Sequence, residues 1–466
     1  MIIDNFLNSY NSKVSEKDIL DSMESHRESM AVKVKEVNFD QLEKWSTNSS
    51  GDFVHDSGKF FRICGARAFN KTTGEERYQP IIDQPEQGIL GIITRYNNGC
   101  LEVLLQAKIE PGNLRNVQYS PTVQATKSNY TGAHKGKGVA YIQDFMPSSE
   151  KVVNRIFQSE HGYKFYRKAN DNVHVHDNNA SCLDTRFMWL TLGHIRFLLS
   201  KEHCINMDTR SVLATMDFIG TPLTRDEIFH GMENMNSLEN QLLFSSLSEQ
   251  GAKHSLESIT QWVSNCKANS SIEYSTVPLN LLTDKGWVKT KNKISSQHNK
   301  QFELVGIKAS IESREVSSWY QPIVRDNIPK TYAFLVKKIN GIVHVLAQMV
   351  EEDYNWSGPE LGPTFHSIQS QSELNENLET NNLTSENCKV IYDKYQSEEG
   401  GRFLEQKNRY MLILADENLD INMGNNFRWM TLYQLKKMTG FECSVNIEAR
   451  TLLSIASYYR GEKSAH

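Results

Sequence analysis

The sequence Leu101-Glu-Val-Leu-Leu105 continues directly into Gln106-Ala-Lys-Ile-Glu-Pro-Gly-Asn113, and its character changes from apolar to polar at the junction. A buried polar group needs a hydrogen-bond partner, so an ordinary core strand would not carry so many of them. Alternation along a strand puts Lys108 and Glu110 on the same face. We therefore predict a strand that leaves the core and delivers polar side chains to a pocket. The alternative is a surface strand with a salt bridge.

A second polar stretch, Ser120-Pro-Thr-Val-Gln-Ala-Thr-Lys-Ser-Asn-Tyr130, follows a few residues later. Hydroxyls, amides and a lysine in one segment suit a diphosphate and the hydroxyl groups of a sugar. The alternative is a solvated loop. The pair of stretches therefore favours a polar ligand bound near the end of the predicted strand.

Composition limits the class of protein. The 466 residues are enough for two or three domains, and 39% hydrophobic with 23% charged residues fits a soluble globular chain. A formal net charge of −5 argues against nucleic acid as the main partner. The seven cysteines contain no C-x-x-C pair, and no apolar run approaches the length of a membrane span. We expect a cytoplasmic protein that binds neither nucleic acid nor membrane.

The pattern recurs about half a chain later, which indicates an internal duplication. Arg77-Tyr-Gln-Pro-Ile81 matches Trp319-Tyr-Gln-Pro-Ile323, and Phe187-Met-Trp-Leu-Thr-Leu192 matches Phe427-Arg-Trp-Met-Thr-Leu432. Asn206-Met-Asp-Thr-Arg210 likewise matches Asn446-Ile-Glu-Ala-Arg450. We therefore expect an N-terminal helical segment (1–30), a first repeat (31–215), a helical linker (216–251) and a second repeat (252–466). The segment 221–250 has no counterpart by sequence.

The polar strand differs between the two copies. Glu110 corresponds to Glu352, whereas Lys108 corresponds to Val350. We therefore expect the first copy to hold the fuller site. In the second copy Thr364 keeps the position of Thr122, and His366 takes the position of Gln124.

Local patterns predict the elements of each copy. Two β-rich runs flank Asn98-Gly99 and again Asn340-Gly341, which is a strong hairpin signal. Arg186–Leu199 is predicted to be an amphipathic helix, and residues 15–30 and the segment beginning at Thr224 are predicted to be helices with hydroxyl caps. Strands followed by a helix in each copy indicate an α+β or mixed α/β/α sandwich.

Other polar motifs are less specific. His174-Val-His176 is interpreted as part of a structural strand because leucines occupy the corresponding positions of the second copy. Arg210 and Arg450 fit either a helix-end ion pair or a ligand contact. No G-x-G-x-x-G motif follows a strand and no further His/Cys cluster occurs, so we expect no cofactor and no metal.

The strings Gln106-Ala-Lys-Ile-Glu-Pro-Gly-Asn113 and Ser120-Pro-Thr-Val-Gln-Ala-Thr126 resemble the NDP-hexose 2,3-dehydratase family, and the resemblance covers most of the chain. It implies two tandem Nudix-like α/β/α sandwich domains with mixed sheets, a homodimer, and dTDP-4-keto-6-deoxyglucose as substrate. It also implies a pathway in which a 3-ketoreductase acts downstream. The Nudix hydrolase box is absent from both copies, so the fold is implied without metal-dependent hydrolysis.

The implied reaction removes the proton on carbon 3 of the sugar and expels the hydroxyl of carbon 2. Lys108 is a candidate to stabilise the enolate, and Glu110, Tyr130 and His134 are candidates for base and acid. Residues of both copies are candidates for binding the substrate: Arg67, Gln79, Gln106, Asn113, Ser120, Thr122, Gln124, Lys127, Asn129, Trp319, Glu352, Thr364, His366 and Arg402. The competing functions are a Nudix-type pyrophosphohydrolase, a non-catalytic sugar-nucleotide binder and a 4-keto sugar isomerase.

Overall fold

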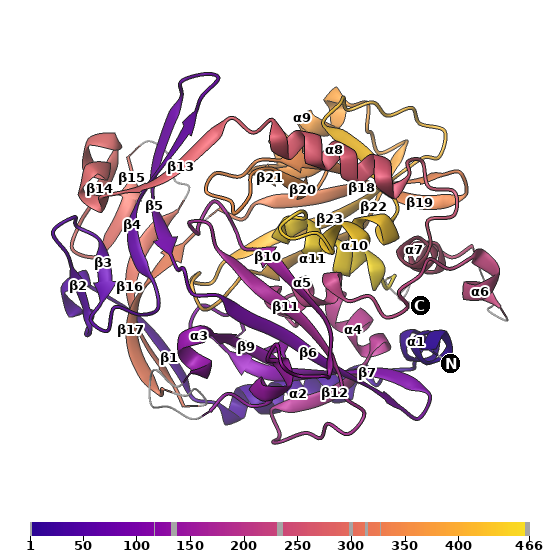
Figure 1. Ribbon diagram of the computed structural model, residues 1–466, viewed down its shortest axis with the longest axis horizontal. Coiled ribbons are helices and arrows are strands. Elements are labelled where there is room, and N and C mark those ends of the chain that lie inside the picture. The colour runs from indigo at the N-terminus through magenta and orange to yellow at the C-terminus, as the bar shows by residue number, and fades with distance from the viewer. Residues whose placement is uncertain are drawn as a thin grey trace.

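The computed structural model describes residues 2–115, 117–131, 138–230, 236–297, 302–312, 316–326 and 328–461. Its two halves have the same arrangement of mixed sheets and helices (Figure 1). The predicted fold class, a duplicated α+β architecture with mixed sheets, is therefore confirmed. No helix among these residues is long and apolar enough to cross a membrane.

Within the described residues, each half contains a sheet of seven strands in which one pair is parallel and the others are antiparallel. In the first half these are β6 (Gly88–Asn97), β7 (Cys100–Ile109), β8 (Val117–Pro121), β9 (Val123–Thr126), β10 (Val152–Ser159), β11 (Ala169–His176) and β12 (Phe187–Thr191). In the second half they are β18 (Thr331–Ile339), β19 (Ile342–Val350), β20 (Glu360–Gly362), β21 (Phe365–Ile368), β22 (Cys388–Ser397), β23 (Lys407–Ala415) and β24 (Phe427–Met430).

The hairpin between β6 and β7 turns at Asn98-Gly99, and that between β18 and β19 turns at Asn340-Gly341, as predicted. All four turn residues have positive φ angles, between 48° and 82°. Asn and Gly tolerate this conformation better than other residues, which explains why the two hairpins form at these places.

Two smaller sheets join the halves, because each of them takes a strand from the other half. β1 (Val32–Val37) pairs with β16 of the second half, and β13 (Ile272–Val277) pairs with β4 of the first half. The remaining strands of these sheets are β2 (Trp45–Thr47), β3 (Phe53–His55), β4 (Arg62–Asn70), β5 (Glu76–Asp83), β14 (Trp287–Lys289), β15 (Lys293–Ser296), β16 (Glu303–Ile311) and β17 (Ser318–Arg325). The exchange is reciprocal, so it ties both halves together.

Helices cover the large sheets and link the halves (Figure 1). The α-helices are α1 (Ile2–Tyr10), α2 (Glu16–Ser29), α3 (Lys127–Tyr130), α4 (Leu192–Leu199), α5 (Met207–Thr215), α6 (Arg225–Phe229), α7 (Leu238–Leu247), α8 (Leu256–Ala268), α9 (Gln371–Thr380), α10 (Leu432–Thr439) and α11 (Ile447–Ser457). The part of the chain that the structure describes also contains the short 3-10 helices η1 (Phe39–Gln41), η2 (Ile142–Phe145) and η3 (Leu279–Lys285). The predicted caps of α2 and α6 are present, since Ser15 and Thr224 each accept a backbone hydrogen bond.

The prediction of one helix over Arg186–Leu199 was wrong for its first half. Phe187–Thr191 forms the edge strand β12, which pairs with β7, and the helix α4 begins only at Leu192. Thr191 caps α4 in a capping box with His194. The apolar residues Phe187 and Leu190 fit either a strand or a helix by periodicity, and pairing with β7 decides between them. Trp189 therefore lies on a strand.

The structure gives α7 a counterpart that the sequence comparison missed. Ser9 of α1 bonds the carbonyl of Leu101 and accepts from the amide of Leu192. Ser245 of α7 makes the same two bonds, to Val343 and Leu432. The two helices hold equivalent positions in the two halves, so the duplication extends into segments whose sequences no longer match.

One apolar core runs through both halves, with Val103 and Leu213 from the first and Val345 and Leu453 from the second. At its centre α5 and α11 pack against each other and exchange buried arginine contacts.

Arg210 donates to the carbonyl oxygens of Ile205 and Ser397, both at 2.6 Å. Arg450 mirrors it, donating to Val445 and Ser159, both at 2.5 Å. Both arginines are 0% exposed and bond backbone carbonyl oxygens, so they serve the protein interior and do not line the pocket.

We predict that Arg210→Met lowers the free energy of unfolding by roughly 3 kcal/mol, because it removes charged hydrogen bonds and leaves buried carbonyl oxygens without partners. Urea unfolding measures the change. The control is Arg27→Met, since Arg27 is exposed and forms an ion pair with Glu24 at 3.3 Å; such a pair contributes less than about 1 kcal/mol. Equal stability of the two variants would contradict the central role of Arg210.

Candidate active site

A pocket of about 580 Å³ opens between the large sheet of the first half and the small sheets, and both halves line it. Its polar and charged lining from the first half includes Lys108 and Glu110 at the end of β7, with Gln124, Asn129, Lys168, Asn170 and Asp208. The second half contributes Lys308, Ser318, Trp319, Tyr320, Gln321, Glu399, Gly401 and Arg402. Six residues predicted from sequence are thus brought together here: Lys108, Glu110, Gln124, Asn129, Trp319 and Arg402.

A chain of hydrogen bonds fixes the polar strand. Lys108 Nζ lies 3.5 Å from Glu110 Oε1 and donates to the carbonyl of Gln124 at 3.3 Å. Gln124 in turn donates to Glu110 at 3.1 Å and accepts from Asn206 at 3.1 Å. Since Asn206 caps α5, the chain links the strand to the helix that carries Asp208. Glu110 is 6% exposed, so the prediction of a strand that delivers these groups to a pocket fits better than a surface salt bridge.

Carboxyl groups crowd the inner end of the pocket. Asp208 is 4% exposed, and burial together with Glu160, Glu399 and Glu110 raises its pKa well above the usual range. Burial is also the main cause that raises the pKa of Glu399 to about 7, against the opposing effect of Arg402. Carboxylates this close in a dry site cannot all be ionised. Burial and mutual repulsion thus favour the protonated form of Asp208 and Glu399.

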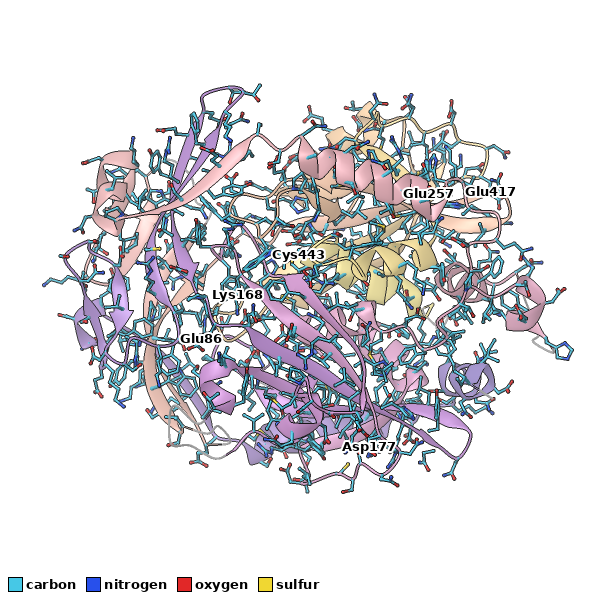
Figure 2. The ribbon with its side chains drawn as sticks, viewed as in Figure 1. Glu86, Lys168, Asp177, Glu257, Glu417 and Cys443 are labelled. Carbon is cyan, nitrogen blue, oxygen red and sulfur yellow. The ribbon has the colours of Figure 1, made fainter. Side chains whose placement is uncertain are left out.

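Cations face these acids. Burial lowers the pKa of Lys168 to about 8, and its ammonium donates to the backbone carbonyl of Glu86, which lies beside it in Figure 2. Arg402 donates to Gln84 at 3.1 Å and lies over the ring of Phe61 at 4.3 Å. Together with Lys108 they offer charged donors to an anionic ligand.

The outer end of the pocket is aromatic, with Trp45, Phe60, Phe61, Trp319 and Tyr320 in its wall. Trp319 donates to Gln321 at 2.8 Å, and Trp45 donates to the carbonyl of Tyr320 at 2.7 Å, so both indoles are held in place. Lys44 and Lys308 lie in the same wall. Aromatic faces beside lysines suit a nucleobase with its diphosphate.

Several residues predicted to bind substrate support the fold instead. Thr122 bonds the amide of Ile93 at 3.0 Å, and Thr364 bonds Leu335 at 2.9 Å in the same way. Ser120 accepts from Asn206 at 3.0 Å. Their hydroxyls are satisfied by the protein itself and do not line the pocket.

The remaining predicted residues also lie outside the pocket lining. Arg67 pairs with Glu76 at 2.5 Å on the surface, and Gln79 donates to the carbonyl of Tyr163 at 2.5 Å. Lys127 is exposed, and Gln106 lies within β7. Tyr130 packs beside the apolar cluster around Ile89. His134 lies outside the described residues.

The Pro111-Gly112 turn brings the two halves into contact. Gly112 donates to the carbonyl of Gly400 at 2.7 Å, and a Cβ on Gly112 would lie 1.8 Å from the carbonyl oxygen of Phe403. Asn113 lies against Gly400, whose Cβ would be 2.0 Å from the Asn113 amide oxygen. Glycine is thus required for a close backbone approach, with the partner a loop of the second half and not a ligand.

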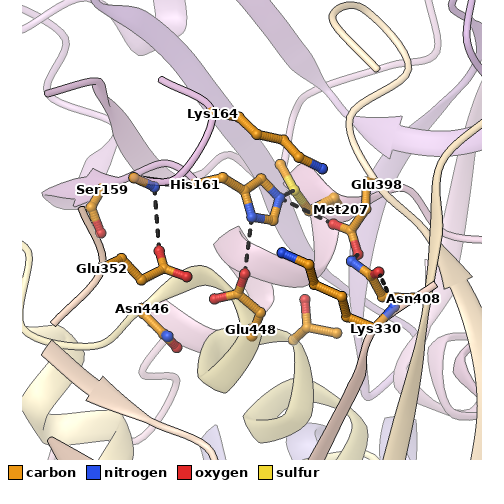
Figure 3. Close-up of polar contacts among 12 residues, drawn as sticks. Ser159, His161, Lys164, Met207, Lys330, Glu352, Glu398, Asn408, Asn446 and Glu448 are labelled. Carbon is orange, nitrogen blue, oxygen red and sulfur yellow. Dashed lines mark hydrogen bonds and ion pairs between the residues drawn. The ribbon is translucent and has the colours of Figure 1, made fainter. Parts of the chain in front are cut away.

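In the second half the corresponding positions form a closed cluster. His161 lies between Glu448 and Glu398, at 3.0 Å and 3.1 Å (Figure 3). His366 lies 3.2 Å from Glu352. Tyr332 takes the position of Leu90, so a larger, buried aromatic side chain stands where the first half has a leucine that lines the pocket.

Ion pairing controls the titration of this cluster. Burial alone would lower the pKa of His161, but its contacts with Glu398 and Glu448 outweigh burial and raise it to about 10. Burial opposes the effect on Glu398, and His161 nevertheless lowers the pKa of that carboxyl to about 2. Ligand atoms of Glu352, His366 and Glu448 lie within 4.8 Å of one another, a spacing that suits a metal ion. His161 already bonds Glu448 of this group and balances part of its negative charge.

Sequence reasoning missed Asp208, Glu399 and Lys168. Two signals were present: Asp208 lies inside the repeated Asn206-to-Arg210 motif, and Gln158-Ser-Glu-His-Gly162 matches Gln396-Ser-Glu-Glu-Gly400. The second match puts Glu399 at the position of His161.

Comparison with known proteins shows the family of this chain. The model of the NDP-hexose 2,3-dehydratase family matches residues 16–216 and again 256–456. The chain therefore belongs to the NDP-hexose 2,3-dehydratase family, whose reaction makes its members hydro-lyases.

Curated relatives carry the name dTDP-4-dehydro-6-deoxy-alpha-D-glucopyranose 2,3-dehydratase. The protein of Saccharopolyspora spinosa is 36% identical over 90% of this chain and 86% of its own length. That of Streptomyces violaceoruber is 34% identical over 89% and 90%, and that of Amycolatopsis orientalis is 34% identical over 94% and 89%. Two structures of a C. elegans Ap4A hydrolase match 24% and 28% of this chain, at 15% and 13% identity and TM-scores of 0.18 and 0.20.

We predict that His161→Gln destabilises the protein by roughly 3 to 5 kcal/mol at about pH 7, because two buried carboxylates lose their shared cation. The pKa of His161 is raised on folding to about 10. Its stabilisation is therefore fully present below about pH 6.5 and is lost as the pH rises through about 10. Urea unfolding at several pH values should show the deficit shrinking with rising pH. His230→Gln, at an exposed position, is the control; a pH-independent deficit would contradict the ion pairs.

Proposed function

We propose that this protein eliminates water across carbons 2 and 3 of dTDP-4-dehydro-6-deoxyglucose and yields a dTDP-3,4-diketo-2,6-dideoxyhexose. The observation that carries the proposal is the pocket itself, in which Lys108 and Glu110 meet buried carboxyl groups at one end of an aromatic, lysine-lined cavity. The reaction needs a base, an acid and a cation near the ketone, and it needs no redox partner.

The two ends of the pocket suit the two ends of the substrate. The nucleobase would stack among Trp45, Trp319 and Tyr320, and the diphosphate would lie near Lys308 and Arg402. The hexose then reaches the inner end, where Lys108, Glu110, Asp208 and Glu399 lie. This orientation brings the 4-ketone and carbon 3 to the charged groups.

Proton removal and enolate stabilisation can each be assigned to a residue of the pocket. Glu110 takes the carbon 3 proton, which the neighbouring ketone makes acidic. Lys108 stabilises the negative charge that develops on the carbon 4 oxygen. Lys108 Nζ lies 3.5 Å from Glu110 Oε1, so the proposed base and the proposed cation reach the same part of the sugar.

We also propose which enzyme acts next, where this protein is located and how it assembles. The diketone product is reactive, so a 3-ketoreductase is the class of enzyme that must consume it. A cytoplasmic homodimer is proposed from the family resemblance.

We predict that Glu110→Gln and Lys108→Met each lower kcat by roughly a hundredfold or more, since one removes the base and the other the charge that stabilises the enolate. Mass spectrometry of dTDP-4-dehydro-6-deoxyglucose, with a 3-ketoreductase added to trap the product, follows the loss of water. Glu150→Gln changes an exposed carboxylate and should keep full activity. Near-normal turnover of both pocket variants would remove the proposed roles, and an unchanged substrate mass with wild-type protein would remove the function.

We predict that Trp319→Ala raises KM and the Kd of dTDP by roughly tenfold and leaves kcat nearly unchanged, because stacking on a base contributes about 1 to 3 kcal/mol to binding. Isothermal titration with dTDP and steady-state kinetics measure the two effects. Trp356→Ala alters a tryptophan outside the pocket lining and serves as the matched variant. A fall in kcat with unchanged dTDP affinity would argue against stacking.

A further inference from the structure

Glu399 comes from the second half of the chain, yet it lines the pocket that the first half dominates. Gly401 lies between Glu399 and Glu110, the residue proposed as the base. A Cβ added to Gly401 would lie 3.2 Å from Glu399 Oε1 and 3.5 Å from Glu110 Oε1. The two carboxyl oxygens therefore flank one small gap at the inner end of the pocket. Such a pair can act on neighbouring carbons of one sugar ring.

The duplicated site shows what Glu399 changes. At its position the other copy has His161, which bonds two carboxylates and closes the cluster. In the first half Glu160 has no such partner: its Oε1 accepts from Asn170 at 2.6 Å, and its buried Oε2 has no hydrogen-bond partner among the described residues. With the Glu399 carboxyl group in place of an imidazole, the first site stays open to the pocket. Several acidic groups lie close together there, and the site can hold a proton.

Asp208 is the competing acid of the pocket. It lies at the second residue of α5, and burial together with Glu160, Glu399 and Glu110 raises its pKa well above the usual range, so it releases a proton less readily near neutral pH. Glu399 lies in a loop with no helix start, between buried carboxyl groups and Arg402. Its pKa of about 7 suits proton donation near neutral pH. These features favour Glu399 over Asp208 as the donor.

We propose that Glu399 is the general acid that protonates the departing carbon 2 hydroxyl, a role that rests on the proposed dehydratase function. Glu110 takes the carbon 3 proton and the C–H electrons form the enolate. The enolate electrons then form the double bond between carbons 2 and 3 and restore the 4-ketone. The bond from carbon 2 to oxygen breaks, and the oxygen leaves as water with the proton of Glu399. The resulting 3-enol takes up a proton at carbon 2 and gives the diketone.

The test separates the two proton transfers. Wild type, Glu399→Gln, Asp208→Asn and Glu110→Gln are each incubated with dTDP-4-dehydro-6-deoxyglucose in D2O, and mass and NMR follow water loss and deuterium at carbon 3. Glu399→Gln should lose water at least a hundredfold more slowly. It should still exchange the carbon 3 proton, because base and enolate site remain. Glu110→Gln should lose both activities.

Binding and pH dependence separate catalysis from structure. Gln resembles a protonated Glu in shape, so Glu399→Gln should keep the Kd of dTDP within about threefold and the thermal midpoint of the wild type. The wild-type kcat should fall as the pH rises through about 7, when Glu399 loses its proton, and the variant should lose this limb. Glu405→Gln, an exposed position in the same loop, is the control.

Each outcome decides one question. Normal water loss by Glu399→Gln, or loss of water elimination with retained exchange only in Asp208→Asn, would overturn the role of Glu399 and leave the dehydratase function standing. Loss of exchange and dehydration together in Glu399→Gln would also overturn an acid role. A wild-type protein that neither exchanges nor dehydrates this substrate would overturn the proposed function and the role with it.

Discussion

Two buried arginines hold the halves of this molecule in register, and the site depends on them. The guanidinium of Arg210 binds the carbonyl of Ser397, two residues before Glu399. Arg450 binds Ser159, two residues before His161. A fully buried cation with fixed donors accepts little displacement, because its hydrogen bonds cannot be replaced by water. Each half therefore fixes the loop of the other half that supplies a side chain to its own cluster: Glu399 reaches the first half and His161 reaches the second.

The same scaffold carries two sites with opposite electrostatics. In the first half, carboxyl groups face a cavity and repel one another, as the raised pKa values of Asp208 and Glu399 indicate. In the second half, His161 converts the repulsion into a buried ion network, and Tyr332 fills the space. The two copies of this loop differ at the position of Glu399 and His161. Glu399 belongs to the arrangement that is proposed to be reactive, and His161 belongs to the stable one. Like charges held in a dry pocket are costly for stability and useful for proton transfer.

Sequence rules correctly predicted the features that short-range interactions along the chain determine. The Asn-Gly hairpins, the caps of α2 and α6, and the polar end of β7 follow from turn and alternation rules. The strand exchange of β1 and β13 did not, because pairing between distant segments leaves no local pattern. The helix predicted from Arg186 failed for the same reason, since pairing with β7 outweighed its periodicity. Among the site residues, those on β7 and β9 were found, while Asp208 and Glu399 arrive through packing of the halves.

Many polar residues that recur in both repeats serve the fold, so their recurrence does not identify the catalytic residues. Thr122 and Thr364 recur because both sheets need the same hydrogen bonds, and the duplicated arginines recur because both interfaces need them. Other positions differ between the copies, such as Lys108 against Val350 and Glu399 against His161, so no structural contact common to both copies fixes their residue type. Comparison of the two copies therefore separates many side chains of the scaffold from Lys108 and Glu399, which have no like counterpart in the other copy. Glu110 is the exception, because it corresponds to Glu352 and is still proposed to act on the substrate.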